Sequence, residues 1–174
     1  MPLTPADPRD LEAVAALVNS AYRGETSRRG WTTEADYLDG QRTDAETLRR
    51  DLAGNENAVL LTYRDGEDGL LLGTVWLEPA GEEAWYLGML TVRPDQQARQ
   101  LGRTVLAGAE AEAARRGAKR VIMTVVNIRD TLIAWYERRG YRLTGETRPF
   151  PYDDERFGVP RRDDLAFVVL EKVL

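Results

Sequence analysis

Residues 90–103 read Leu-Thr-Val-Arg-Pro-Asp-Gln-Gln-Ala-Arg-Gln-Leu-Gly-Arg, and this stretch decides the fold. Its apolar and β-branched start is typical of the end of a strand, and Pro94 closes that strand. After a short polar loop, Leu101, Val105 and Ala109 recur in steps of four, which places them on one face of a helix. The stretch therefore predicts a strand, a loop and a long helix in direct succession.

The beginning of this helix is a candidate binding site for an anion. Its first backbone N–H groups have no acceptor within the helix, and the helix dipole adds positive potential there. Arg99 and Arg103 flank the turn and add positive charge. A pyrophosphate is the natural ligand of such a site. A plain strand–helix connection with two solvated arginines explains the same residues, because the stretch lacks a full glycine-rich phosphate motif.

Strands and helices alternate on both sides of this stretch. We expect strands over residues 58–63, 70–78, 83–92, 121–126, 141–147 and 165–170, with room for a short leading strand. We expect helices over residues 8–22, 43–52, 101–116 and 130–139. Hairpin turns and helical crossovers are both implied. The predicted class is α/β, with a mixed, mostly antiparallel central sheet of six to seven strands flanked by about four helices.

Composition limits the chemistry that this chain can perform. Its 174 residues fit a single domain over residues 1–174. The chain contains no cysteine and no histidine, which excludes disulfides, cysteine nucleophiles, zinc sites of the Cys/His type and serine–histidine triads. Chemistry must therefore use carboxylates, tyrosines, backbone groups or a bound cofactor, and we expect no metal.

Charge and hydropathy limit the partners. The formal net charge is −5 and the acidic residues are spread along the chain, so we expect no nucleic-acid partner. No apolar run approaches the roughly 20 residues that span a bilayer, so we expect no membrane association. The first residues lack the basic and apolar regions of a signal peptide, and we therefore expect a cytoplasmic protein.

A second motif, Trp-Tyr-Glu-Arg-Arg-Gly-Tyr at residues 135–141, gives the loop a context. Together the two motifs resemble the GNAT superfamily, the acyl-CoA-dependent N-acetyltransferases. The resemblance covers roughly residues 1–172. The pyrophosphate loop of that family reads Gln/Arg-x-x-Gly-x-Gly/Ala, and Gln97 and Gly102 match its first and third defined positions. Gln100 stands in place of the usual glycine. It is tolerated if its backbone keeps a negative φ, and its side chain could also narrow the phosphate cradle.

The resemblance implies acetyl-CoA as co-substrate. It also implies a bulge that splays the strand 83–92 from the strand 121–126, so that the pantetheine arm enters the gap. The backbone of Leu90 and Val92 would then bond the pantetheine amides, and an N–H near Leu90 would polarise the thioester carbonyl. The expected cofactor-binding residues are Leu90, Val92, Gln97, Ala98, Arg99, Gln100, Leu101, Gly102, Arg103, Asn127 and Tyr136.

The resemblance gives Tyr136 the role of general acid toward the departing thiolate. A phenol with a pKa near about 10 can protonate a thiolate with a pKa near about 8.5 without a large shift. The alternative is that Tyr136 only packs beside Trp135. Asn127 lies nine residues before Tyr136, whereas the family asparagine lies seven before, at the position of Arg129. A plain strand-end asparagine explains Asn127 equally well.

No general base stands out in the sequence. Tyr86 occupies the position where many family members carry a glutamate, and a neutral tyrosine is a poor base at pH 7. Water could carry the proton instead. The acids nearest these elements are expected to be solvated; they are Glu34, Asp36, Asp39, Glu82 and Glu83.

The acceptor pocket is expected between the polar loop 23–42 and the two C-terminal strands. Aromatic side chains from these segments suit a ligand cation, although each explains itself as ordinary packing. The expected substrate residues are Trp31, Tyr86 and Phe150, with Tyr37, Trp85 and Tyr152 as further aromatic walls. A small-molecule amine or a peptide N-terminus would fit such a pocket.

Three functional hypotheses remain open. The first is an acetyl-CoA-dependent N-acetyltransferase that transfers an acetyl group directly to a primary amine, because the usual covalent nucleophiles are scarce. The second is an acyl-CoA-binding sensor with little catalysis, which Gln100 and the missing strand glutamate favour. The third is an interaction domain that forms a homodimer through its exposed last strand.

Overall fold

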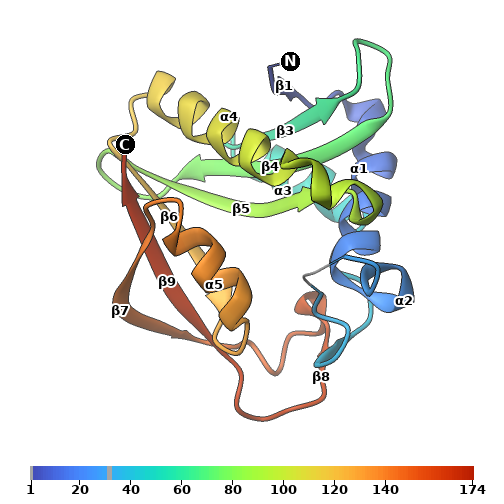
Figure 1. Ribbon diagram of the computed structural model, residues 1–174, viewed down its shortest axis with the longest axis vertical. Coiled ribbons are helices and arrows are strands. Elements are labelled where there is room, and N and C mark those ends of the chain that lie inside the picture. The colour runs from blue at the N-terminus through green and yellow to red at the C-terminus, as the bar shows by residue number, and fades with distance from the viewer. Residues whose placement is uncertain (1, 31–32) are drawn as a thin grey trace.

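The computed structural model describes residues 2–30 and 33–174, with side chains except at residues 97–99. This part of the chain forms a seven-stranded sheet in the order β1-β3-β4-β5-β6-β9-β7, with helices on both faces (Figure 1). The α-helices are α1 (Leu11–Tyr22), α2 (Gly24–Ser27), α3 (Ala45–Gly54), α4 (Leu101–Arg115) and α5 (Asp130–Glu137). Three short 3₁₀ helices are η1 (Pro8–Asp10), η2 (Pro94–Arg99) and η3 (Glu155–Phe157). The strands are β1 (Thr4–Pro5), β2 (Leu38–Asp39), β3 (Val59–Arg64), β4 (Leu71–Pro79), β5 (Ala84–Val92), β6 (Arg120–Val126), β7 (Arg142–Pro149), β8 (Val159–Pro160) and β9 (Ala166–Val173).

The predicted class is confirmed. Within the described residues, β5 and β6 pair in parallel and every other strand pair is antiparallel, so the sheet is mixed and mostly antiparallel. The short leading strand exists as β1. The sequence of the polar loop 23–42 predicts no helix or strand, but the structure has both. It contains the one-turn helix α2 and the strand β2, which pairs with β8 in a separate two-stranded sheet.

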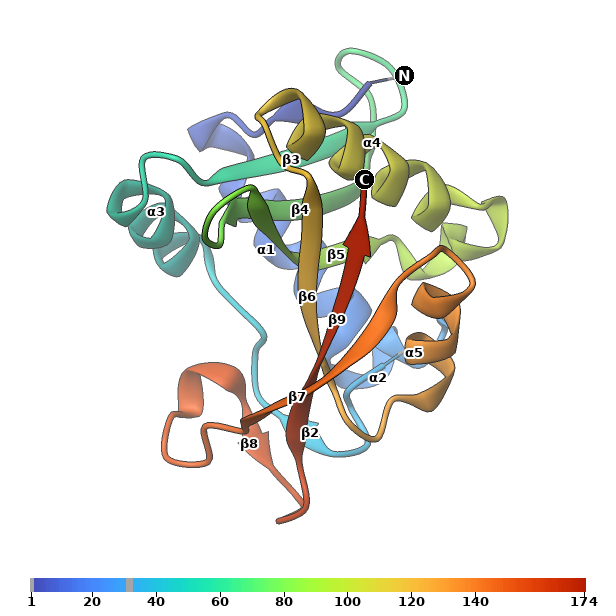
Figure 2. The same ribbon diagram turned by 90° about the vertical axis from the view of Figure 1, so that its left-hand side faces the viewer.

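Two apolar layers enclose the sheet (Figures 1 and 2). Helices α4 and α5 cover one face, and α1 and α3 cover the other. On β3, Val59 and Leu61 pack into the α4 layer while Leu60 between them packs into the α1 layer, as the two-residue period of a strand requires. The middle of the sheet is therefore packed on both faces, and β5 is one of its central strands.

A β-bulge interrupts β5 at Met89 and Leu90. On β4, Thr74 pairs with Thr91 and Trp76 pairs with Gly88, so two residues of β5 lie opposite one residue of β4. Met89 has a φ of 50°, a left-handed conformation that bends the strand. This is the bulge that the family resemblance implied.

The two parallel strands separate beyond the bulge. β5 pairs with β6 only over residues 84–86, and Figure 1 shows the two strands diverging from there. Because β6 continues along β9 instead, one edge of β5 is left without a neighbouring strand over residues 88–92. An extended ligand can pair with such an edge.

Candidate active site

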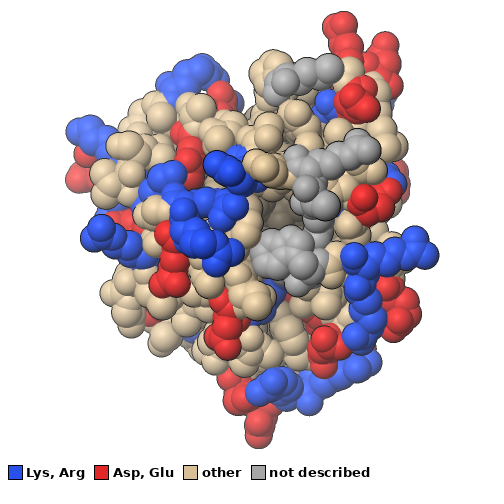
Figure 3. Space-filling view, in the orientation of Figure 1, with Lys and Arg blue, Asp and Glu red and all other residues tan. Residues whose placement is uncertain are grey.

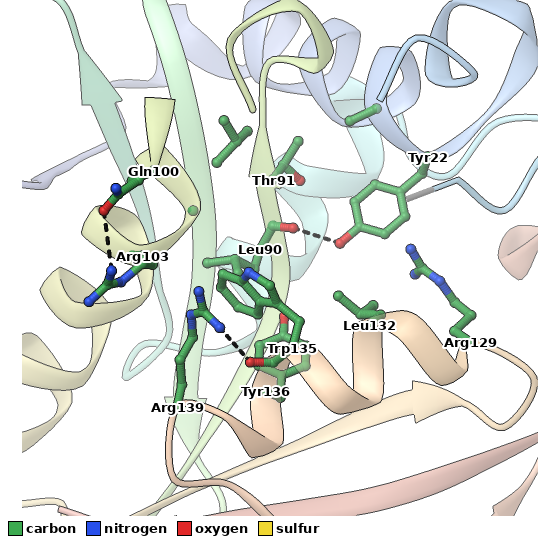
Figure 4. A pocket seen from close by; sticks show the side chains of 13 residues that line it. Tyr22, Leu90, Thr91, Gln100, Arg103, Arg129, Leu132, Trp135, Tyr136 and Arg139 are labelled. Carbon is green, nitrogen blue, oxygen red and sulfur yellow. Dashed lines mark hydrogen bonds between the residues drawn. The ribbon is translucent and has the colours of Figure 1, made fainter. Parts of the chain in front are cut away.

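A cavity of 210 Å³ lies between the bulge of β5, the first turn of α4 and helix α5 (Figure 4). Six of the residues expected to bind the cofactor line it together; they are Leu90, Val92, Gln100, Gly102, Arg103 and Tyr136. Ala21, Tyr22, Thr91, Arg129, Leu132, Trp135 and Arg139 complete the lining. Leu101 packs against the apolar core under α4 instead. The side chains of Gln97, Ala98 and Arg99 lie outside the described residues.

The turn into α4 does not meet the condition under which a glutamine is readily tolerated at position 100. The φ of Gln100 is 60° and its ψ is 16°, so the backbone is left-handed instead of having a negative φ. The chain must reverse between η2 and α4 at this residue, and that geometry explains the glycine that the family pattern has here. The side chain is exposed, and its Oε1 accepts a hydrogen bond of 3.2 Å from Nη1 of Arg103.

The first turn of α4 packs closely against α5. A Cβ atom placed on Gly102 would lie 3.3 Å from the indole ring of Trp135. Glycine therefore lets the helix N-terminus approach this ring and keeps its backbone N–H groups accessible from the cavity.

Basic side chains gather near the middle of the face shown in Figure 3. Arg139 stacks on Trp135 at 3.7 Å from the ring centroid and donates a 2.7 Å hydrogen bond from Nη1 to the Trp135 carbonyl (Figure 4). Burial lowers the pKa of Arg139, and the like charges of Arg103 and Arg138 lower it further. Arg103 and Arg139, which line the cavity together with the first turn of α4, favour a polyanionic group such as a pyrophosphate.

Tyr22 is a site residue that the sequence did not reveal. Its hydroxyl donates a 2.7 Å hydrogen bond to the carbonyl of Leu90, and both residues line the cavity (Figure 4). The bond ties the end of α1 to the bulge, where the ladder with β4 is interrupted. Tyr22 therefore fixes the shape of the open strand edge.

Tyr136 stands between two cavities. It is 5% exposed, and its ring makes edge contacts with Trp135 at 5.0 Å and with Tyr141 at 5.6 Å. Burial raises the pKa of its phenol. It therefore stays protonated at neutral pH, but the raised pKa makes it a weaker acid than an unshifted phenol, so proton transfer to a thiolate is less favourable than the ordinary pKa values indicate. The residue packs into the core and also lines both cavities. Its position is therefore compatible with both the packing role and the role of general acid.

The second cavity, of 610 Å³, is called the acceptor cavity here and lies where the sequence placed an acceptor pocket. Its walls come from the loop 23–42, from β5 and β6, and from the segment that connects β7 to β9. It meets the first cavity at a shared wall made of Tyr22, Leu90, Arg129, Leu132 and Tyr136.

Only some of the aromatic residues expected around an acceptor line the acceptor cavity. Tyr86 and Phe150 line the acceptor cavity, and Phe150 stacks on Phe167 with centroids 5.5 Å apart. Trp31 lies outside the described residues. Trp85 and Tyr37 pack into apolar clusters, and the hydroxyl of Tyr152 accepts a 2.7 Å hydrogen bond from the Leu165 N–H.

A buried ionic cluster borders the acceptor cavity. Glu34 lies 3.3 Å from Arg23 and 3.5 Å from Arg129, and all three side chains are at least 92% buried. The expectation that Glu34 is solvated is therefore wrong. Its backbone N–H bonds the carbonyl of Tyr22 at 2.9 Å, which folds the loop back over α1 and turns the carboxylate inward. The other four acids are exposed, as expected.

Gly158 makes room for this cluster. Its φ is 104°, and a Cβ atom there would collide with the guanidinium of Arg23. That guanidinium donates a 2.9 Å hydrogen bond to the carbonyl of the preceding residue, Phe157. The glycine therefore lets the 155–160 segment close against the loop 23–42.

Asn127 has a structural position rather than a place in either cavity. Its Nδ2 donates to the carbonyl of Asp164 at 3.1 Å, and its Oδ1 accepts from the Ala166 N–H at 3.1 Å. These bonds hold the start of β9 against the end of β6. Arg129, at the family spacing before Tyr136, lines both cavities instead.

The chain matches the model of the acetyltransferase (GNAT) family over residues 12–141 and belongs to that family. No curated protein matches it. Its fold is similar to that of ribosomal-protein-alanine N-acetyltransferase from Brucella melitensis, at 20% identity over 100% of both chains with a TM-score of 0.72. It is also similar to yncA from Salmonella typhimurium, solved with its cofactor acetyl-CoA, at 19% identity over 100% of this chain and 94% of that one, with a TM-score of 0.70.

The described residues offer neither a metal site made of acidic side chains nor a membrane-spanning helix. No group of three acidic side chains among them is arranged to hold a metal ion. Their helices are all too short or too polar to cross a membrane.

Proposed function

We propose that this acetyltransferase moves an acetyl group from acetyl-CoA directly to a primary amine, with residues 1–174 acting as one domain. The observation that carries the proposal is the bulge at Met89 and Leu90. It opens the edge of β5 between the helix N-terminus and Tyr136, and so provides a place for an extended thioester-bearing arm.

The residues of the first cavity divide the work of binding. The first turn of α4, with Arg103 and Arg139 beside it, offers N–H donors and positive charge to the pyrophosphate. The open backbone of Leu90 and Val92 pairs with the pantetheine amides. Because the Leu90 carbonyl already accepts a bond from Tyr22, its geometry is set before the ligand arrives.

The transfer follows from groups on the shared wall. The amine lone pair attacks the thioester carbonyl carbon, forming the C–N bond, while the N–H near Leu90 stabilises the developing oxyanion. The C–S bond then breaks, the sulfur keeps the electron pair, and Tyr136 donates a proton to it. The surplus proton of the amine leaves to water, and water returns a proton to the Tyr136 phenolate, so the phenol is restored for the next cycle. Glu34 is held between two arginines, which makes it a poor proton acceptor.

A second candidate, an acyl-CoA-binding module with little catalysis, is favoured by two observations. Gln100 occupies a left-handed position that suits glycine, and Tyr86 stands where the family resemblance leads one to expect a glutamate. Both features weaken an enzyme more than they weaken a binding protein.

One experiment separates the two candidates. Acetyl-CoA is titrated into the purified protein by calorimetry, and thiol release is then followed with a panel of amines, amino acids and short peptides. The transferase binds acetyl-CoA and releases thiol in an amine-dependent manner. Binding without amine-dependent release supports the sensor, and absence of binding contradicts both.

A further inference from the structure

The acceptor cavity is positively charged although the chain as a whole is acidic. Four arginines from three segments line it; they are Arg23 and Arg42 of the loop 23–42, Arg129 before α5, and Arg148 of β7. Two carboxylates, Glu34 and Glu78, face the same space. The formal charge of the whole chain is −5, so this local excess of cations is opposite in sign to the surrounding protein.

Three of the four arginines already have acidic partners. Arg23 and Arg129 share the single carboxylate of Glu34, which leaves their cluster with a net positive charge. Arg148 pairs with Glu146 at 2.9 Å on the surface. Glu78 lines the same cavity and, together with Arg42, a neighbouring one; its Oε2 accepts bonds from Trp76 and Asn55.

Arg42 is the exception among the cavity arginines. Its guanidinium makes no hydrogen bond or ion pair with any residue that the structure describes, although the side chain is partly buried. Its backbone is nevertheless fixed, because the N–H donates a 2.7 Å bond to Oδ1 of Asn19 on α1. A held, partly desolvated and unpaired guanidinium is an anion-binding group.

We propose that the acceptor is an amino acid or a close relative, an amine that carries a carboxylate, and that Arg42 binds this carboxylate. The inference rests on the proposed function. A planar guanidinium fork matches a carboxylate, and the net charge beside Arg23 and Arg129 adds to the attraction. Phe150 and Phe167 also line the cavity and stack on each other, and they give it an apolar surface that suits a side chain.

The carboxylate takes no part in bond making. The ammonium group of the acceptor loses one proton to become the attacking amine, and its nitrogen loses a second to water when the amide bond with the acetyl carbon forms. The thiol leaves with the proton from Tyr136, and water returns a proton to the phenolate. Anchoring the carboxylate at Arg42 leaves the amine to reach the shared wall, where Leu90 and Tyr136 lie. Arg42 is thus a residue for specificity and binding.

The first arm of the test compares acceptors on the wild-type protein. Thiol release is measured with the twenty standard L-amino acids, with the carboxamides of those that react, and with the matching amines that lack the carboxyl group. At least one amino acid is expected to react with a KM about 10- to 100-fold below that of its amide and its amine, since a charge-assisted pair is lost in both. A preferred amine without a carboxylate, or a preferred peptide N-terminus, overturns the inference and leaves the proposed function intact.

The second arm uses Arg42→Gln, with Arg50→Gln as the matched control. Arg50 lies on the exposed face of α3, where it pairs only with Glu46. Arg42→Gln is expected to raise the KM of the amino acid about 10- to 100-fold with kcat within about threefold, and to leave the KM of the amine without a carboxylate unchanged. Arg42→Lys is expected to restore part of the loss, because it returns the charge without the fork.

Calorimetric titration of acetyl-CoA into each variant separates the two claims. If Arg42→Gln leaves acetyl-CoA binding unchanged and raises the KM of every acceptor equally, with or without a carboxylate, then Arg42 does not bind the carboxylate. If the wild type binds acetyl-CoA and none of the amino acids reacts, the inference is wrong. If acetyl-CoA does not bind at all, the proposed function fails as well.

Discussion

The two cavities that meet at Tyr136 are built in different ways. The first cavity, where we propose that acetyl-CoA binds, comes mainly from two short segments, 90–103 and 129–139, and presents backbone atoms of a bulge and a helix end. The acceptor cavity draws on the loop 23–42, on β5 and β6 and on residues 148–167, and its distinctive groups are charged side chains. Under the proposed function, backbone geometry selects the ligand of the first cavity and side-chain charge selects the ligand of the second.

The two cavities thus divide two tasks of the proposed reaction, which are binding the co-substrate and selecting the acceptor. A backbone site tolerates many side-chain changes, whereas a site made of arginines can change its ligand with one substitution. The shared wall of Tyr22, Leu90, Arg129, Leu132 and Tyr136 is the place where both ligands can meet.

The largest expected effect tests the shared wall. Tyr136→Phe is expected to lower kcat about 10²- to 10⁴-fold and to leave acetyl-CoA affinity within about twofold, because only the proton donor is removed. The phenyl ring keeps the contacts with Trp135 and Tyr141, so the melting temperature should change little. Steady-state thiol release measures the effect, and a kcat within about threefold of the wild type would show that Tyr136 only packs.

The next effect concerns the loop that closes the acceptor cavity. Glu34→Ala leaves Arg23 and Arg129 buried without their shared carboxylate, and the free energy of unfolding is expected to fall by about 3–5 kcal/mol. Asp36→Ala is the matched control, since Asp36 lies in the same loop and pairs with Arg28 on the surface. Urea unfolding of both variants measures the difference. Equal stabilities for the two would mean that the buried cluster does not hold the loop.

A smaller effect is expected at the start of α4. Gly102→Val places methyl groups where the Cβ position is already 3.3 Å from Trp135, and should weaken acetyl-CoA binding about tenfold or more. Ala107→Val on the exposed face of the same helix controls for placing a β-branched side chain in α4. Calorimetric titration compares the two, and an affinity that is equal in both variants would remove Gly102 from the binding site.

The smallest effect sharpens the role of the left-handed turn. Gln100→Gly removes backbone strain of about 1–2 kcal/mol from the folded state. The greater freedom of glycine in the unfolded chain opposes this gain by about 0.5–1 kcal/mol of free energy. The free energy of unfolding should therefore rise by about 1 kcal/mol or less. Gln100→Ala keeps the strain and loses only the bond to Arg103. Thermal or urea unfolding ranks the three proteins. A glycine variant less stable than the alanine variant would contradict a strained turn.

The elements around the first cavity could be predicted from the sequence because each is encoded by a short, continuous stretch. The strand, loop and helix of residues 90–103 are consecutive, and the motif around Tyr136 lies on the short helix that follows β6. The left-handed Gln100 was missed because a non-glycine residue predicts a negative φ unless the tertiary structure forces otherwise.

The acceptor half could be predicted only in outline. The burial of Glu34 depends on the packing of the loop over α1 and on the space that Gly158 leaves for Arg23, 135 residues further along the chain than that arginine. The bond from Tyr22 to Leu90 joins residues 68 positions apart. The two-residue strands β2 and β8 carry no periodic pattern. Such contacts are set by tertiary packing, which no local pattern reports.

Hydrogen–deuterium exchange with and without acetyl-CoA tests the central claim most directly, because it locates the bound co-substrate on the backbone. We expect slower exchange in peptides covering residues 88–92 and 100–103 and in those covering α5, with no change in the β3–β4 hairpin or in residues 148–160. Protection that appears only in the acceptor cavity segments, or binding without protection at the β5 bulge, would contradict the account.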